Sequence, residues 1–271
     1  MPNGQVNHRS ILSPAPLIVL LLLGFAMNHT SQAEEQPPSD AKLPRVALCH
    51  PLGLSQLGAT KFTLRGWSLK GATEVTTDDD GVTIKILNQG SAPVPGRQKT
   101  EEIGDEQLEL EVTLPDSFDQ SDLQLTVVTS AGKSKPHRLL VKGEAPIIDE
   151  VEPNDGFRQA QLIAFPQIVA GNLHADGNVD VFALELTQAQ SLRIEVIAAT
   201  LGSNFDSVLT LYTDSGKILS SNDDAGTTHD SLIETMLTPG RYLVTLQDAH
   251  DHSGPAHPYR LKVTPQQESA P

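Results

Sequence analysis

The sequence has little cysteine, few aromatic residues and few basic residues. Cys49 is the single cysteine, so no disulfide bond can form within the chain. Aromatic residues make up 4% of the sequence, and 19 basic residues stand against 34 acidic ones, for a formal net charge of -15. This charge argues against nucleic acid or anionic lipid as a partner. Because no disulfide bond can stabilise the chain, its stability must come from buried apolar surface or from bound ions.

No apolar run reaches the roughly eighteen residues that a membrane-spanning helix needs. The longest run extends from Leu17 to Met27, and the small residues Ser31 and Ala33 follow it in the pattern of a signal-peptidase site. We therefore expect residues 1–33 to be a cleaved signal peptide. The mature chain would begin at Glu34, would have no transmembrane segment, and would be secreted or periplasmic.

The composition of the mature chain predicts an all-β protein. Removal of 33 residues from 271 leaves 238, enough for two domains. Gly (20) and Pro (19) are plentiful, and apolar residues come in short alternating runs, which is typical of β-sandwiches. We expect two β-sandwich domains, with boundaries as follows: a disordered tether at 34–43, the first sandwich at 44–142, the second at 148–265, and a disordered tail at 266–271.

Alternation of apolar and polar residues supports both domains. In such a strand one face is buried and the other is wet, as in an antiparallel sheet with one solvated side. A tight hairpin turn is expected at Asp214 to Lys217, between two apolar runs. The alternating apolar residues are Phe62 and Leu64; Leu108, Leu110, Val112 and Leu114; Leu123, Leu125 and Val127; Leu192, Ile194 and Val196; Tyr242, Val244 and Leu246; and Tyr259, Leu261 and Val263.

The most concentrated group of oxygen ligands lies in an acidic motif, Asp149 to Asp155. It contains four carboxylates and the amide of Asn154 around a single proline, and it is too short and polar for a core strand. Pro153 favours an extended Glu152, so Glu150, Glu152 and Asn154 could project from one side. Ca²⁺ takes six to eight oxygen ligands of these kinds. The alternative is a solvated acidic linker.

The first domain resembles an immunoglobulin-like domain of the IPT/TIG type. The resemblance rests on Pro51-Leu52-Gly53, on the strand Gly58 to Gly66, and on the following segment Leu69 to Val75. It implies a structural spacer or a binding module and no catalysis.

The second domain resembles the bacterial pre-peptidase C-terminal (PPC) domain. The resemblance implies a jelly-roll-like β-sandwich, found on secreted hydrolases and also on exported proteins without an enzyme. It is similar to the collagen-binding modules of clostridial collagenases, in which acidic residues hold Ca²⁺. The matching blocks include Glu150 to Asp155, Ala160-Gln161, Val169 to Leu173, Asn178 to Leu184, Leu192 to Val196, Phe205 to Tyr212, Asn222 to Asp224, Asp230 to Leu232, Pro239 to Tyr242 and Tyr259 to Leu261.

This resemblance implies a set of calcium ligands in the present chain. Asp176 and Asn178 compete for one role, because the segment from His174 to Asn178 matches only in part. The collagen-contacting aromatic residues have no clear counterpart, so collagen binding is not implied. The implied ligands are Glu150, Glu152, Asn154 and Asp155 from the acidic motif, with Asp176 and Asp180 from the following hairpin.

Two further polar groups have the ligand types of metal sites. The first comprises Asp206, Asn222, Asp223, Asp224 and Asp230, and the second comprises His250, Asp251, His252 and His257. Asp and Asn in long loops commonly bond to their own backbone, and that interpretation is preferred for the first group. For the histidines, zinc competes with an ordinary polar loop, since no cysteine or H-x-x-x-H helix supports a zinc site.

The sequence contains none of the common catalytic motifs. G-x-S-x-G, H-E-x-x-H, Walker A and G-x-G-x-x-G are absent, and two domains use nearly all of the mature chain. We therefore expect a noncatalytic, calcium-stabilised accessory protein that attaches to an extracellular or envelope protein or polysaccharide. The alternatives are a calcium-stiffened structural spacer of the envelope and, less favoured, a cryptic hydrolase built on an acidic pair.

Overall fold

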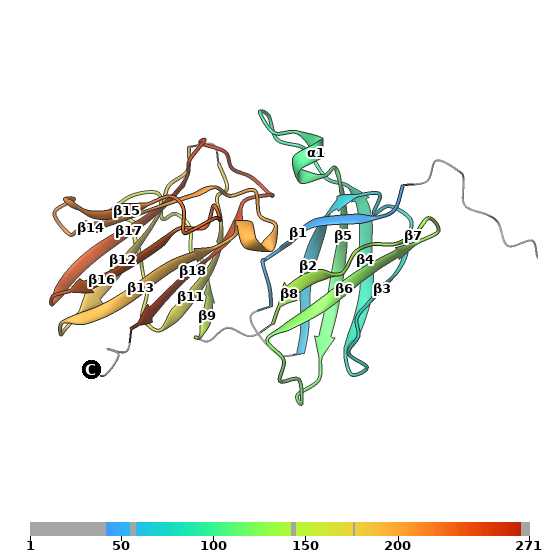
Figure 1. Ribbon diagram of the computed structural model, residues 1–271, viewed down its shortest axis with the longest axis horizontal. Coiled ribbons are helices and arrows are strands. Elements are labelled where there is room, and N and C mark those ends of the chain that lie inside the picture. The colour runs from blue at the N-terminus through green and yellow to red at the C-terminus, as the bar shows by residue number, and fades with distance from the viewer. Residues whose placement is uncertain (1–41, 55–57, 142–144, 176, 267–271) are drawn as a thin grey trace, which may run out of the picture. The chain divides into compact units, whose positions relative to one another are not determined.

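The computed structural model describes residues 42–54, 58–141, 145–175 and 177–266. The expected signal peptide, most of the tether and of the tail, and the metal-ligand candidate Asp176 lie outside these residues. The described part of the chain belongs to one compact unit, Pro37–Pro271. It is built almost entirely of β-strands (Figure 1), so the predicted all-β fold is confirmed. In the same ranges, no helix is both long and apolar enough to cross a bilayer.

Two sheets form in the first part of the chain. One has the strand order β1-β2-β5-β4, and the other has the order β3-β6-β7 with β8 also paired to β6. A short helix, α1 (Thr100–Ile103), precedes β5. The strands are β1 (Arg45–His50), β2 (Gly58–Trp67), β3 (Ala72–Thr76), β4 (Thr83–Ser91), β5 (Glu106–Leu114), β6 (Asp122–Thr129), β7 (Gly132–Lys133) and β8 (His137–Leu140).

Two more sheets form in the second part. Their strand orders are β10-β12-β17-β14-β15 and β16-β13-β18-β11-β9. A 3-10 turn, η1 (Ala199–Leu201), lies between β13 and β14. The strands are β9 (Ile147–Asp149), β10 (Gln161–Leu162), β11 (Gln167–Asn172), β12 (Asp180–Leu186), β13 (Gln190–Ile197), β14 (Ser207–Thr213), β15 (Ile218–Asn222), β16 (Leu232–Leu237), β17 (Gly240–Asp248) and β18 (Pro258–Pro265).

Each pair of sheets encloses a hydrophobic core of its own. The first core contains the buried residues that alternate along β5 and β6, for example Leu110 and Leu125. The second contains the corresponding residues of β13 and β18, for example Ile194 and Leu261, and apart from Leu52 its buried members lie between Ile163 and Val263. The predicted alternation thus identifies the buried face of these strands. Each pair of sheets is a sandwich.

Two central strands of the second sandwich, β17 and β18, differ from the prediction of one wet face. On β18 the expected wet residue Arg260 is buried. Along β17 both Val244 and its neighbours Leu243 and Thr245 are buried. A second small cluster, which includes Ala160 and Val179, covers the outer face of β12 and β17. Alternation marks a half-buried strand, and it could not reveal that Ala160 and Val179, from the segment between β9 and β12, pack on the outer face.

The predicted hairpin turn at Asp214 to Lys217 is confirmed. It joins the antiparallel pair β14 and β15, and the Thr213 N–H donates to the Lys217 carbonyl at 2.9 Å. Gly216 has a φ of 84°, a conformation that a glycine adopts without steric cost.

Candidate functional site

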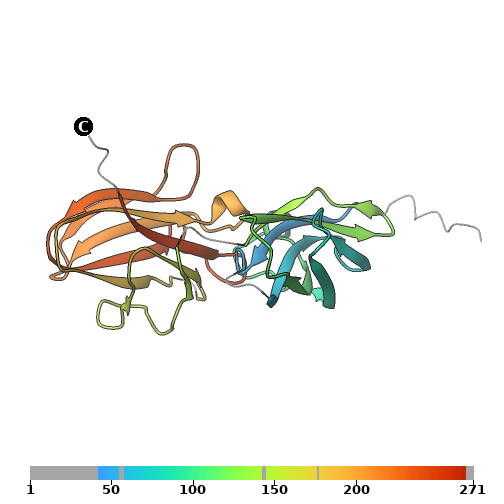
Figure 2. The ribbon, with the colours of Figure 1, turned by 90° about the horizontal axis from the view of Figure 1, so that it is seen from below.

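The acidic motif connects the two sheets of the second sandwich. It follows β9, where the Glu150 N–H donates to the Ala170 carbonyl of β11 at 2.9 Å. Four residues later, the Asn154 carbonyl accepts a hydrogen bond from the Val181 N–H of β12 at 2.9 Å. Strands β11 and β12 belong to different sheets, so the motif is fixed to both. In Figure 2 this part of the chain lies in the long yellow-green loops beside the sandwich.

The Glu150 carboxylate is the centre of the hydrogen-bond network. Its Oε2 accepts the Asn172 backbone N–H at 3.0 Å. Its Oε1 accepts both the Asn154 side-chain amide at 3.0 Å and the Tyr259 hydroxyl at 2.7 Å. Two strands outside the motif, β11 and β18, together with the motif's own Asn154, therefore hold one carboxylate in a fixed position.

Asn154 is completely buried, and half of its amide is satisfied. Its Nδ2 donates to Glu150, and its backbone N–H donates to the Glu152 Oε2 at 3.0 Å. Its Oδ1 is buried and accepts no hydrogen bond from the described part of the chain. An unsatisfied buried acceptor costs about 1–3 kcal/mol, and a cation beside the oxygen would remove that cost.

Asp180 and Tyr259 form a buried pair beneath the motif. The Tyr259 hydroxyl lies 2.6 Å from Asp180 Oδ2, while Asp180 Oδ1 accepts the Asn178 side-chain amide at 2.7 Å. Burial, together with the nearby negative charge of Glu150, raises the pKa of Asp180 to about 9. Burial and the same two carboxylates raise the pKa of Tyr259 well above its ordinary value. Without a cation, this site holds a proton on Asp180 at neutral pH.

The carboxylates are spaced for a single hard cation. One oxygen from each of Glu152, Asp155 and Asp180 lies within 4.8 Å of the others. Calcium–oxygen distances are about 2.3–2.6 Å, so oxygens on opposite sides of one Ca²⁺ are about 4.6–5.2 Å apart. Glu150 and Glu152 also approach His174, whose Nδ1 lies 3.4 Å from the Glu152 Oε1. The carboxylate oxygens are therefore close enough together to hold one metal ion, and oxygen is the ligand type that Ca²⁺ takes.

The structure brings together five of the six candidate ligands: Glu150, Glu152, Asn154, Asp155 and Asp180. Asp176, the sixth, lies outside the described residues. The sequence does not mark Tyr259 as a site residue: Tyr259 is 109 residues from Glu150 and is predicted only as an inward-facing strand residue. Nor does the sequence mark Asn172, whose buried Oδ1 accepts no bond from the described residues, or His174. No local pattern marks these residues, because the fold alone places them beside the motif.

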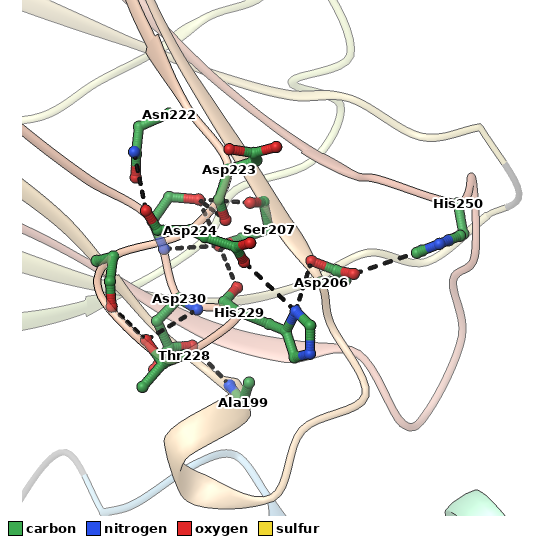
Figure 3. A network of polar contacts seen from close by, with 12 residues as sticks. Ala199, Asp206, Ser207, Asn222, Asp223, Asp224, Thr228, His229, Asp230 and His250 are labelled. Atoms are coloured by element: carbon green, nitrogen blue, oxygen red, sulfur yellow. Dashed lines mark hydrogen bonds and ion pairs between the residues drawn. The ribbon is translucent and has the colours of Figure 1, made fainter.

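The second acidic group divides into two parts (Figure 3). Asp230 bonds to backbone, as expected for loop chemistry: its carboxylate accepts the N–H groups of Ala198, Ala199 and Thr200 at 2.9, 2.7 and 3.3 Å. Asp206 and Asp224 instead face a histidine, His229.

The acidic loop residues and the histidines, treated separately in the sequence, meet in the structure. His250 lies beside Asp206, with His250 Nδ1 3.5 Å from Asp206 Oδ2. The rings of His250 and His252 stack at 5.8 Å, and that of His257 lies 6.3 Å from His252.

No family model and no curated protein sequence matches the chain. Among solved structures, it is similar to the pre-peptidase C-terminal domain of a collagenase from Bacillus anthracis, at 17% identity and a TM-score of 0.33, over 42% of this chain and 99% of that one. It is also similar to SGBP-B of the Bacteroides ovatus mixed-linkage glucan utilization locus, solved with a mixed-linkage heptasaccharide (9% identity, TM-score 0.26, 81% and 74% covered). A third similar structure is the secreted serine protease VesC from Vibrio cholerae, at 12% identity and a TM-score of 0.27. The match covers 79% of this chain and 49% of VesC.

Proposed function

We propose that the chain is an exported, noncatalytic accessory protein whose second sandwich binds Ca²⁺ and attaches to an extracellular or envelope protein or polysaccharide. The observation that carries the calcium assignment is the buried Asn154 Oδ1, which lacks a donor among the described residues, while the side-chain amide and backbone N–H of Asn154 donate to the carboxylates of Glu150 and Glu152. The proposed ligands are Glu150, Glu152, Asn154, Asp155 and Asp180, together with Asp176.

Bound Ca²⁺ would supply positive charge where the carboxylates otherwise repel one another. The neighbouring residues would keep the carboxylates in position. Tyr259 holds Glu150 and Asp180 in position, and Asn172 fixes the second oxygen of Glu150 through its backbone N–H. The result would be a rigid connection from β9 across both sheets.

A groove with a mixed polar and apolar lining on the second sandwich offers a candidate attachment surface. It has a volume of about 620 Å³ and is lined by Arg193, Glu195, Thr200, Asn222 and Thr228, among others. Arg193 is held within it by Glu195 and Glu234, at 2.9 and 2.7 Å. Fixed charged and hydroxyl groups of this kind can donate to and accept from a hydroxylated polymer or a peptide backbone.

Retention of the mature chain on immobilised ligands tests this proposal. Purified envelope polysaccharides and extracellular proteins would be presented with millimolar Ca²⁺ or with a chelator. We expect retention on one ligand class in Ca²⁺, reduced retention in chelator, and a further reduction for Arg193→Ala. Arg241→Ala is the matched control, since Arg241 also pairs with a carboxylate, Asp214 at 2.6 Å, but does not line the groove.

Two outcomes would contradict the proposal. Retention on none of the ligands, with calcium binding intact, would favour the structural spacer. Turnover of a peptide, ester or glycoside substrate that a single point substitution abolishes would show an enzyme.

A further inference from the structure

We infer that the second sandwich also holds a divalent transition metal, of which Zn²⁺ is the probe, between Asp206, Asp224 and His229. This site is separate from the acidic motif and uses a different chemistry. Asp206 lies just before β14, whereas Asp224 and His229 lie in the loop between β15 and β16. A metal here would fasten that loop to the start of β14.

The spacing of the three side chains is that of ion pairs and also that of ligands on one metal ion. His229 Nδ1 lies 3.4 Å from Asp206 Oδ1 and 3.4 Å from Asp224 Oδ1 (Figure 3). N–H···O bonds in proteins are usually about 2.7–3.2 Å long. Two ligands about 2.0–2.1 Å from a tetrahedral Zn²⁺ are about 3.4 Å apart. One imidazole nitrogen thus stands at ligand spacing from two carboxylates at once.

The ligand types select the metal. Imidazole nitrogen is a good ligand for Zn²⁺, Cu²⁺ and Ni²⁺, whereas Ca²⁺ takes oxygen ligands. Three protein ligands leave a tetrahedral ion one position for water. His250 positions the Asp206 carboxylate, because His250 Nδ1 lies 3.5 Å from Oδ2, the oxygen of Asp206 that does not face His229.

Buried groups fix the backbone at two of the three ligand residues, Asp206 and His229. Asp248 is 3% exposed, and its carboxylate accepts the backbone N–H groups of Asp206, His250 and His252 at 3.0, 2.9 and 3.0 Å. Ser207, which is fully buried, donates its hydroxyl to the His229 carbonyl at 3.1 Å. Preformed ligands of this kind lower the ordering cost of binding.

Calorimetric titration of the mature chain with Zn²⁺, in millimolar Ca²⁺ so that the acidic motif is occupied, tests the inference. We expect the wild type to bind Zn²⁺ in a way that calcium does not displace. His229→Ala and Asp224→Asn should each remove zinc binding. His250→Ala should weaken it by about 10- to 100-fold, because His250 supports a ligand. The side chains of His229, Asp224 and His250 are 68%, 56% and 65% exposed, so the variants should melt like the wild type without zinc.

The control is His174→Ala, since His174 lies beside Glu150 and Glu152 and is the histidine most able to bind zinc elsewhere. Its zinc binding should equal that of the wild type. The inference is overturned if zinc binding survives His229→Ala, if His174→Ala removes it, or if the wild type binds no zinc.

Discussion

The Tyr259 hydroxyl carries one proton but lies within hydrogen-bond distance of two carboxylates, Glu150 and Asp180. It can donate to only one of them. A proton on Asp180 allows both hydrogen bonds, because Asp180 then donates to the tyrosine oxygen while the tyrosine hydroxyl donates to Glu150. The raised pKa of Asp180, about 9, agrees with that arrangement. Calcium at the site would take the place of this proton, so its binding should release a proton and weaken at low pH.

In chelator, the stability of the metal-free chain should therefore depend on Asp180. The folded pKa of about 9 exceeds the ordinary value of 3.8, so between these values the folded state binds a proton that the unfolded state has lost. This contribution to stability is present below about pH 4 and is lost as the pH rises toward 9. We expect Asp180→Asn to raise the melting temperature by several degrees at about pH 8 and little at about pH 5. Equal effects at both pH values would show that Asp180 is ionised in the folded chain.

At the scale of elements, the cross-strand pair of Gly171 on β11 and Tyr259 on β18 makes the site possible. A Cβ atom at Gly171 would collide with the Tyr259 ring and hydroxyl. The bare backbone lets the ring lie flat across β11 and reach Glu150 and Asp180. A glycine in a strand often marks such a close approach.

Gly171→Ala should push the ring aside. We expect a loss of about 1–3 kcal/mol in the free energy of unfolding, as for overpacked cores, together with weaker calcium binding. Gly90→Ala is the matched control, because Gly90 also lies in a strand, β4, and a Cβ there would meet nothing within 4 Å. Denaturant unfolding and calcium titration of both variants measure the effect. Equal behaviour of the two variants would contradict this account of Tyr259.

Sequence predicted some elements better than others. Alternation identified the buried residues of β5, β6 and β13, because strand period and burial coincide there, whereas on β18 the expected wet residue Arg260 is also buried. It misjudged β17, whose outer face is covered by chain far away in the sequence. Contacts between segments distant in sequence also limited the prediction of the site. The acidic motif is local and could be found, whereas Tyr259, Asn172 and His229 acquire their roles only when distant strands and loops meet.

For the whole molecule, we propose that the two sandwiches are separate domains joined within residues 142–148. Each has a hydrophobic core of its own, and the junction contains Gly143 and Pro146. Limited proteolysis should cut in this junction and leave two resistant fragments, identified by mass spectrometry. A single resistant fragment that spans the junction at high protease would show one cooperative unit.

The central claim is that calcium binds at the acidic motif, and thermal melts of the mature chain with Ca²⁺ and with chelator test it most directly. For an extracellular site with a Kd of about 0.1–1 mM, calcium at ten times Kd should stabilise by about 1.4 kcal/mol, which raises the Tm by several degrees. Glu152→Ala should lose most of this rise, whereas Glu234→Ala, which removes an exposed carboxylate on β16, should keep it. A wild-type Tm that is the same in calcium and in chelator would contradict the claim and leave the motif a solvated acidic linker.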